Sequence, residues 1–190
     1  DDRQFVAYYD KDRMMTVASR ELGSDKWVRK TLSSKLHWDS HNYVTMGIDE
    51  KGYIHVSGNM HVNPLVYYRS GKPLDVTTMR EVHRMNGEQE DRVTYPQFSN
   101  DGEGRLFFNY RAGTCGDGNV LVKHFDSESM RWTNHSDAPL FQGVEAYNKR
   151  AAYHRQVRDS KGNLHYVWMW RWTPEVETSH QLCYAKTPDQ

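Results

Sequence analysis

Residues 49–56 have the sequence DEKGYIHV, and two other stretches repeat this pattern: 101-DGEGRLFF-108 and 159-DSKGNLHYV-167. In each, an aspartate and a glycine stand where a tight turn would form, and alternating or continuous apolar residues follow. Glycine supplies the positive φ angle that hairpin turns need, and aspartate caps the turn with its side chain. We therefore expect three β-hairpins. A weaker fourth copy is 10-DKDR-13.

The spacing of these hairpins predicts a β-propeller. The turn glycines Gly52, Gly104 and Gly162 are 52 and 58 residues apart. No long stretch has the 3.6-residue periodicity of a helix. Repeats of about 50 residues with several strands each are typical of propeller blades, so each repeat is expected to form one blade of four antiparallel strands. A strand-like run follows each hairpin, as this requires: 65-LVYYRS-70, 119-NVLVKHFD-126 and 181-QLCYAKT-187.

The length of the chain limits the number of blades. At about 50 residues per blade, the 190 residues make about four blades within a single domain, residues 1–190. An incomplete circle would leave sheet edges unpaired. We therefore expect the chain to be part of a larger propeller, or to associate with further copies of itself. The alternative is a β-sandwich whose turns resemble one another by chance.

Composition excludes some classes of partner. Lys+Arg and Asp+Glu both number 25, so the formal net charge is zero. Proteins that coat nucleic acids or bind membrane surfaces usually carry a basic surplus, so we expect neither nucleic acid nor membrane as a partner. No apolar run has the length of a transmembrane helix. Low hydrophobic content (37%) and high aromatic content (13%) favour β-structure and a polar, aromatic-lined site.

Two histidines mark one end of the first of these hairpins. His41 precedes one strand, His61 follows its partner, and both are equally distant from the turn at residues 50–52. A hairpin register therefore places both at the end opposite the turn, where side chains can converge on one pocket. Asn42, the neighbour of His41, is expected to contact a ligand there. The alternative is that either histidine simply caps a strand end.

The next hairpin places Tyr95 and Arg111 at the equivalent end. They lie on either side of the turn at residues 101–104, as His41 and His61 do around theirs. His and Tyr are common proton-transfer side chains, and Arg binds a carboxylate through two hydrogen bonds. The four residues are therefore candidates for one catalytic site. The alternative is a hydrogen-bonded tyrosine and a surface arginine.

The third hairpin offers aromatic and basic side chains at its end. Trp170 and Trp172 lie on the same side of an extended segment. Exposed aromatic rings stack on sugars, and arginines suit an anionic sugar. The alternative is that the tryptophans pack between blades. The pattern predicts a sugar-binding surface from Tyr147, Asn148, Arg155, Trp170, Arg171 and Trp172.

Metal-binding and nucleotide-binding motifs are scarce. The sequence has no HExxH, four-cysteine cluster or EF-hand loop, and no GxSxG, P-loop or Rossmann glycine pattern. Cys115 and Cys183 are 68 residues apart. They allow a disulfide, two free thiols, or a structural zinc site that links blades with His180 or His124 as a further ligand.

Three long strings resemble the BNR-repeat propeller proteins that include the ulvan lyases. They are 38-WDSHNYVTMGIDEKGYIHVSGNMHVNPLVYYRS-70, 94-TYPQFSNDGEGRLFFNYRAG-113 and 157-VRDSKGNLHYVWMWRWTPEVETSHQLCYAKTPD-189. The resemblance covers nearly the whole chain. It implies a seven-bladed propeller, of which 190 residues would form only a part, and an enzyme that cuts acidic algal polysaccharide by β-elimination next to a uronic acid.

The resemblance also implies roles for named residues. Arg111 would neutralise the uronate carboxylate, His41 would take the adjacent ring proton, and Tyr95 would protonate the leaving oxygen or serve as both acid and base. His61 would support the carboxylate or orient its partner. The reaction needs no cofactor. A structural zinc is implied separately, with Cys115 and Cys183 as two ligands and Met169 where a further thiol is expected.

Two other functions stay open at this point. A BNR-type glycoside hydrolase would need two carboxylic acids, for which Asp39 and Glu145 are the candidates. A non-catalytic carbohydrate-binding propeller would bind through Trp170, Arg171 and Trp172. In each case the partner is a polysaccharide too large to enter a cell, so the expected location is extracellular or periplasmic.

Overall fold

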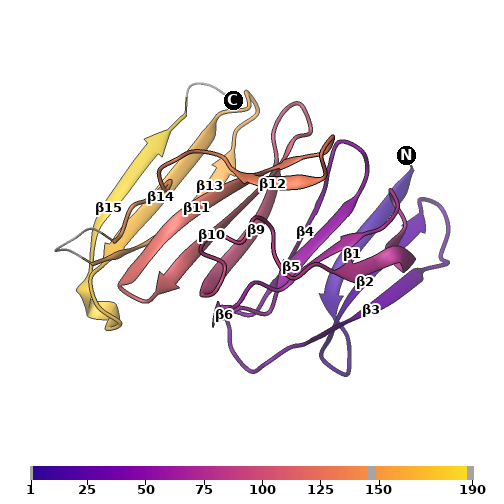
Figure 1. Cartoon of the computed structure of the whole chain (residues 1–190), viewed down its shortest axis with the longest axis horizontal. Helices are drawn as coiled ribbons and strands as arrows, with labels where there is room; N and C mark the ends of the chain where they lie inside the picture. Colours follow the sequence, from indigo (N-terminus) through magenta and orange to yellow (C-terminus); the bar gives the residue numbers. More distant parts are fainter. Residues whose placement is uncertain (1, 145–148, 188–190) are drawn as a thin grey trace.

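The computed structural model describes residues 2–144 and 149–187. Within these residues the fold is all-β, with four antiparallel sheets that follow one another along the chain like the blades of an open propeller (Figure 1). The first sheet has the order β1 (Arg3–Tyr9), β2 (Met14–Glu21), β3 (Val28–Lys35). The second has the order β4 (Val44–Ile48), β5 (Ile54–Gly58), β7 (Tyr67–Ser70), β8 (Met79–Glu81).

The third sheet is the largest, and the fourth lies at the C-terminal end of the row (Figure 1). The third has the order β12 (Arg131–Asn134), β11 (Asp117–Asp126), β10 (Leu106–Thr114), β9 (Val93–Asn100), β6 (His61–Asn63). The fourth has the order β13 (Ala151–Arg158), β14 (Leu164–Arg171), β15 (Ser179–Lys186). Two short 3₁₀ turns, η1 (Val76–Thr78) and η2 (Val176–Thr178), precede β8 and β15.

About four blades were expected, and four sheets are found, but the strand count is not uniform. The described sheets have three, four, five and three strands in place of four each. The third sheet gains a strand because β6 leaves the second blade and pairs with β9, His61 opposite Thr94. A segment that follows β5 in the sequence thus becomes part of the next blade.

The repeated aspartate turns have one common geometry. At residues 49–53, the Asp49 N–H donates to the Tyr53 carbonyl, and the Asp49 carboxylate accepts the backbone N–H groups of Lys51 and Tyr53 at 3.0 and 2.8 Å. The third residue after the aspartate has positive φ: Gly52 (83°), Gly104 (87°) and Gly162 (88°). The weak fourth copy at residues 10–13 forms the same turn, with Arg13 at φ 66° in place of glycine.

Three of these turns lie at one end of the blades. Asn100 Nδ2 donates to both the Ile48 and Gly104 carbonyls, which brings the turns at residues 49–52 and 101–104 together. The turns at residues 101–104 and 159–162 lie next to one pocket, which is lined by Asp101 and Arg158. We call this the turn end, defined by residues 49–52, 101–104 and 159–162, and the opposite end of the same hairpins the site end.

The hairpin of β1 and β2 runs the other way. The Leu36 N–H donates to the Arg13 carbonyl at 2.8 Å, and the Arg13 guanidinium lies 5.3 Å from the centre of the Trp38 ring. Its turn at residues 10–13 is therefore close to the segment that leads to His41. The local sequence alone predicts the shape of this turn, whereas its place at the site end follows from the packing of the first sheet.

The core consists of three apolar clusters between successive sheets. One joins the first and second sheets around Ile54 and Val56, a second joins the second and third sheets around Phe108 and Trp132, and the third lies between the last two sheets. Leu182 on β15 is 78% exposed, so the outer face of the fourth sheet has no cover within the described chain. No helix in the described residues is long and apolar enough to cross a bilayer.

Candidate functional site

His41 and His61 meet at the site end, as the hairpin register predicts. Val44 pairs with Gly58 across β4 and β5, and the same register continued outward sets His41 opposite His61. Their imidazole rings stack with centroids 3.9 Å apart and planes 19° apart. His61 is held from the other side as well, because β6 is hydrogen-bonded to the third sheet.

A carboxylate joins the two imidazoles. Asp39 Oδ1 lies 2.5 Å from His41 Nδ1, and Asp39 Oδ2 lies 2.6 Å from His61 Nδ1. The backbone N–H of His41 also donates to Asp39 Oδ1 at 2.9 Å. This backbone hydrogen bond, followed by those from the two histidine side chains, holds the pKa of Asp39 well below its usual range. Asp39 is therefore ionised at neutral pH.

Tyr95 sits beside His41 on an irregular part of β9. The pairing of β9 with β10 shifts between Asn109 and Arg111, which marks a β-bulge. Tyr95 has φ 59°, a left-handed conformation that is costly for a tyrosine, and its ring centroid lies 5.6 Å from that of His41. Burial raises the pKa of Tyr95, and the charge of Arg111 opposes this only in part. The phenol therefore keeps its proton at neutral pH.

Arg111 is a buried cation that has no counter-ion among the described residues. Its side chain is 0% exposed, and neither Nε nor either Nη atom has a hydrogen-bond partner in the described residues. The guanidinium lies 5.0 Å from the Tyr95 ring centre and 5.4 Å from that of Tyr153. Gly118 makes room for it, since a Cβ there would come within 3.1 Å of Arg111 Cγ. A buried charge in this state favours binding of an anion.

Two further predicted arginines lie near this cluster. Arg171 lies 4.1 Å from the Tyr153 ring centre, and its Nε donates to Ser179 Oγ. Burial raises the pKa of Tyr43 to about 12, and the charge of Arg155 opposes this only in part. Arg155 also opposes, more weakly than Arg111, the effect of burial on the pKa of Tyr95. The site end is thus rich in cationic and phenolic groups.

The remaining predicted sugar contacts have different environments. Trp170 is 8% exposed, packs in the core and lies under the Arg150 guanidinium, so the prediction that it stacks on a sugar is wrong. Trp172 is 60% exposed and contacts the His180 ring. Asn42 is buried: its Nδ2 donates weakly to the His37 carbonyl, and its Oδ1 has no partner among the described residues. Tyr147, Asn148 and Glu145 lie outside the described residues.

The expected zinc ligands are not gathered. Both cysteines are free, Cys115 lies beside Tyr153, and Cys183 Sγ contacts the Gln181 carbonyl. Among the described residues, the single group of three His, Cys, Asp or Glu donor atoms within 4.8 Å of one another is Asp39, His41 and His61. Cys115, Cys183 and His180 therefore do not fit a common metal shell, and we assign zinc no role in the site. A structural zinc stays a prediction, which metal analysis of the purified protein would test.

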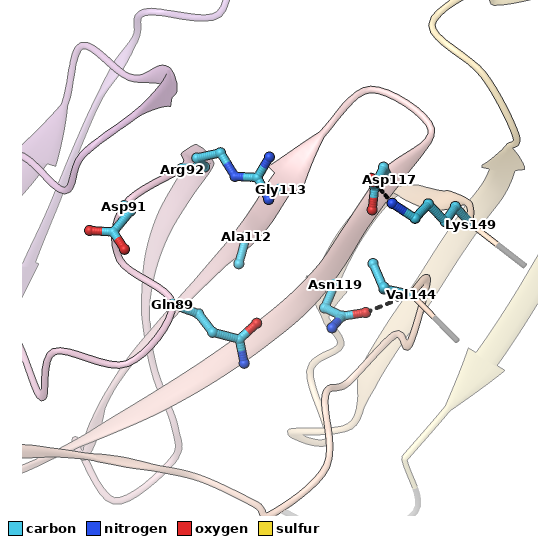
Figure 2. A pocket seen from close by; sticks show the side chains of 9 residues that line it. All are labelled: Gln89, Asp91, Arg92, Ala112, Gly113, Asp117, Asn119, Val144 and Lys149. Carbon is cyan, nitrogen blue, oxygen red and sulfur yellow. Dashed lines mark hydrogen bonds and ion pairs between the residues drawn. The ribbon is translucent and has the colours of Figure 1, made fainter. Parts of the chain in front are cut away.

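A cavity of about 390 Å³ lies further along the site end (Figure 2). Its walls come from β10, β11, the loop before β9 and the residues on either side of 145–148. Lys149 Nζ is paired with Asp117 at 3.0 Å, and Asn119 Oδ1 accepts the Val144 N–H. Arg92 reaches toward Gly113 from the other side (Figure 2). The cavity shares β10 with Arg111 but contains none of the His, Tyr and Arg cluster.

Sequence reasoning missed Tyr43 and the role of Asp39, and it placed Tyr153 at the end of the third hairpin without giving it a role. Tyr43, Tyr95 and Tyr153 each lie six residues before the aspartate of their turn, Asp49, Asp101 and Asp159. The Tyr95 and Tyr153 rings meet edge to face at 6.1 Å. The repeat spacing was thus the signal that could have found all three. Asp39 was named only as a carboxylate for hydrolysis, because nothing local shows that it contacts both histidines.

Comparison with known proteins supports the fold. A search among curated proteins finds no match. Among solved structures, the polysaccharide lyase Uly1 is similar with a TM-score of 0.81 and 18% identity, over 100% of this chain and 51% of that one. A PL25 ulvan lyase is similar with a TM-score of 0.66 and 14% identity, over 90% of this chain and 44% of that one. The chain thus spans about half the length of these lyases.

A glycoside hydrolase is also similar. The endo-arabinase from Bacteroides thetaiotaomicron has a TM-score of 0.51 and 11% identity, over 97% of this chain and 70% of that one. Identities this low show a common fold only, so the chemistry has to be inferred from the residues of the site. The model of the BNR repeat-containing family matches residues 3–190. The chain therefore belongs to the BNR repeat-containing family.

Proposed function

We propose that this chain carries the catalytic site of a polysaccharide lyase that cuts a uronate-containing polysaccharide, ulvan, by β-elimination. The observation that carries this proposal is the buried, unpaired guanidinium of Arg111 next to a protonated Tyr95 and a carboxylate-bound histidine pair. The fold supports it, because two similar structures are polysaccharide lyases, one of them solved with -[GlcA(1-4)Rha3S]- bound.

The reaction needs a cation, a base and an acid. A uronate carboxylate bound to Arg111 makes the adjacent C5 proton more acidic, because the guanidinium stabilises the charge that develops when that proton leaves. The base takes the C5 proton, the freed electron pair forms the C4–C5 double bond, and the bond from C4 to the glycosidic oxygen breaks. The acid then gives a proton to that oxygen, so atoms and charges balance.

The environments of the two proton-transfer groups favour one assignment. Burial keeps Tyr95 protonated, which suits the acid. His41 has its Nδ1 occupied by an ionised carboxylate, which suits the base. His61 shares that carboxylate and stacks on His41, so it orients the base. The alternative use of Tyr95 as both acid and base would require the phenol to lose a proton that burial retains.

Substrate binding requires a movement at Arg111. The guanidinium is 0% exposed and lies against Tyr95 and Tyr153, so a carboxylate reaches it only when one of these rings moves aside. Tyr153 is the better candidate, because its hydroxyl lies beside the Cys115 thiol, a weak partner, and makes no hydrogen bond of normal geometry in the described residues. Arg171, on which Tyr153 also stacks, would remain to bind the polymer.

The product of the reaction separates this proposal from its rivals. Hydrolysis would need a second carboxylate near Asp39, and Glu145, the candidate that the sequence offers, lies outside the described residues. With ulvan, we expect ultraviolet absorbance to rise as unsaturated uronate forms. New reducing ends without this absorbance would indicate a hydrolase, and binding without either signal would indicate a carbohydrate-binding module. Because such a polymer is too large to enter a cell, we propose an extracellular or periplasmic location for the protein.

A further inference from the structure

We propose that Asp39 is the positioning residue of the site: one carboxylate binds both imidazoles through Nδ1 and so presents the Nε2 atoms of His41 and His61 to the substrate. This inference rests on the proposed lyase function for its kinetic consequences. Its structural part, the tautomer of the two histidines, can be tested without any substrate. Asp39 therefore acts through the histidines and does not itself contact the sugar.

The argument starts from what a carboxylate can do. An ionised carboxylate only accepts hydrogen bonds, so each imidazole nitrogen in contact with it must donate. The contacts are His41 Nδ1 at 2.5 Å and His61 Nδ1 at 2.6 Å. Both Nδ1 atoms therefore carry hydrogen. In the neutral ring the other nitrogen, Nε2, then has a free lone pair, and this is the atom that can take a proton from a sugar carbon.

The ring geometry favours a bridging carboxylate over a bound metal ion. A metal ion lies close to the plane of each imidazole that binds it. The two rings are nearly parallel, 19° apart, with centroids separated by 3.9 Å, so one ion could not lie in both planes. A carboxylate has two oxygens, and each ring has its own: Oδ1 for His41 and Oδ2 for His61.

Asp39 is fixed by the loop around it. Its backbone N–H donates to the His37 carbonyl at 3.0 Å, and its carbonyl accepts the Asn42 N–H at 3.1 Å. The loop is tied to the second sheet where Asn59 Oδ1 accepts the His37 N–H at 3.2 Å. These contacts hold the carboxylate between the histidines in the absence of substrate, which is what a preorganised site requires.

The arrangement also limits the charge of the pair. The titratable groups in contact with the stacked rings are Asp39 and, beside His41, Tyr95. A single carboxylate compensates one imidazolium, whereas a second one, stacked 3.9 Å away, would be repelled by the first. Asp39 can therefore compensate the single positive charge that forms when His41 takes a proton from the substrate.

The first experiment compares Asp39→Asn with the wild-type protein by ¹H–¹⁵N correlation of the imidazole nitrogens, assigned with His41→Ala and His61→Ala. In wild type we expect both histidines to carry hydrogen on Nδ1. An asparagine amide donates as well as accepts, so in Asp39→Asn at least one ring changes to the Nε2–H tautomer. Two Nε2–H rings in the wild-type protein would overturn the proposal.

The second experiment measures the kinetics of Asp39→Asn on ulvan. The same change in a Ser-His-Asp triad lowers kcat about 10⁴-fold through the wrong tautomer. We expect a fall in kcat of about 10²-fold or more with KM nearly unchanged. An unchanged kcat would refute the positioning role.

Asp159→Asn is the matched control. Asp159 also binds a histidine, His165 Nε2 at 3.0 Å, with similar exposure but at the turn end. We expect its kcat to equal that of the wild type. Should wild-type protein show no elimination at all, the lyase proposal fails, while the imidazole correlations still decide whether Asp39 sets the tautomers.

Discussion

The two ends of the same hairpins use similar side chains for different purposes. At the turn end, Asp49 binds two backbone N–H groups and His55, which in turn binds the Tyr67 hydroxyl at 2.7 Å. At the site end, Asp39 binds two histidines beside Arg111. The side chains of Asp49, His55 and Tyr67 at the turn end are all hydrogen-bonded. The guanidinium of Arg111, in contrast, has no hydrogen-bond partner in the described chain.

This difference shows where stability and function are divided. Buried polar groups cost free energy unless they are hydrogen-bonded, so a completed cluster stabilises the fold. Unpaired groups such as the Tyr153 hydroxyl and the Arg111 guanidinium lower stability, and a ligand can complete them. We therefore expect substitutions at the turn end to change stability and those at the site end to change rate.

The largest effect is expected from the proton-transfer residues. Replacing Tyr95 with Phe or His41 with Ala removes the acid or the base, and a positioned acid or base contributes about 10²–10⁴-fold to rate. We expect kcat on ulvan to fall by this factor with an unchanged circular dichroism spectrum. Near wild-type turnover in either variant would show that the assigned roles are wrong.

Arg111→Met should separate rate from stability most clearly. Loss of the cation that stabilises the developing charge should cost about 10²–10³-fold in kcat. The folded protein should be as stable as the wild type or more so, because an apolar side chain of similar length replaces a buried, unpaired charge. Thermal unfolding measured beside the kinetics checks both. An Arg111→Met protein that is less stable but still active would contradict the view that the site end serves rate at a cost in stability.

Asp101→Ala tests the turn end. The Asp101 side chain is 4% exposed and accepts hydrogen bonds from the backbone of Glu103 and Arg105 and from the Arg105 guanidinium. These donors are exposed or only partly buried, so a lost hydrogen bond costs about 0.5–1.5 kcal/mol. We expect denaturant unfolding to show this loss, and kcat at a temperature where the variant is folded to match the wild type. A large fall in kcat would mean that the two ends are coupled.

The smallest effect is a change with pH. Burial raises the pKa of Asp101, but the hydrogen bonds from Arg105 and the backbone outweigh it, so the net pKa is lowered. A lowered pKa means that the stabilisation is present above the ordinary value of about 4 and is lost as pH falls below it. Unfolding followed from pH 7 to pH 3 should show this decline, and Asp101→Ala should show less of it. If wild type and Asp101→Ala lose the same stability between pH 7 and pH 3, Asp101 is not a cause of the pH dependence.

Local patterns predicted the features that depend on neighbours in the sequence. The aspartate–glycine spacing was enough to predict the hairpin turns and about four blades. The distance of His41 and His61 from their turn predicted that they meet. Tyr95 and Arg111 came from the same argument, although the bulge sets Arg111 opposite Thr94 in place of Tyr95. A register slips by one residue at a bulge, and periodicity alone does not show where.

The features that escaped prediction depend on contacts between sheets. Trp170 lies on β14 and Trp172 lies just after its end, yet Trp170 is covered by the third sheet and Trp172 is 60% exposed. The transfer of β6 to the third sheet likewise reflects pairing with β9. Cys115 and Cys183 contact different residues because one lies in the β10–β11 turn and the other on β15. None of these contacts has a signal in the nearby sequence.

The most direct test of the account is the ultraviolet absorbance of ulvan mixed with four proteins: wild type, Tyr95→Phe, Arg111→Met and Asp101→Ala. If chemistry belongs to the site end, absorbance rises for the wild type and Asp101→Ala and stays nearly flat for Tyr95→Phe and Arg111→Met. A flat trace for folded wild-type protein, or a rise in all four samples, would contradict the central claim that these residues make the chain a lyase.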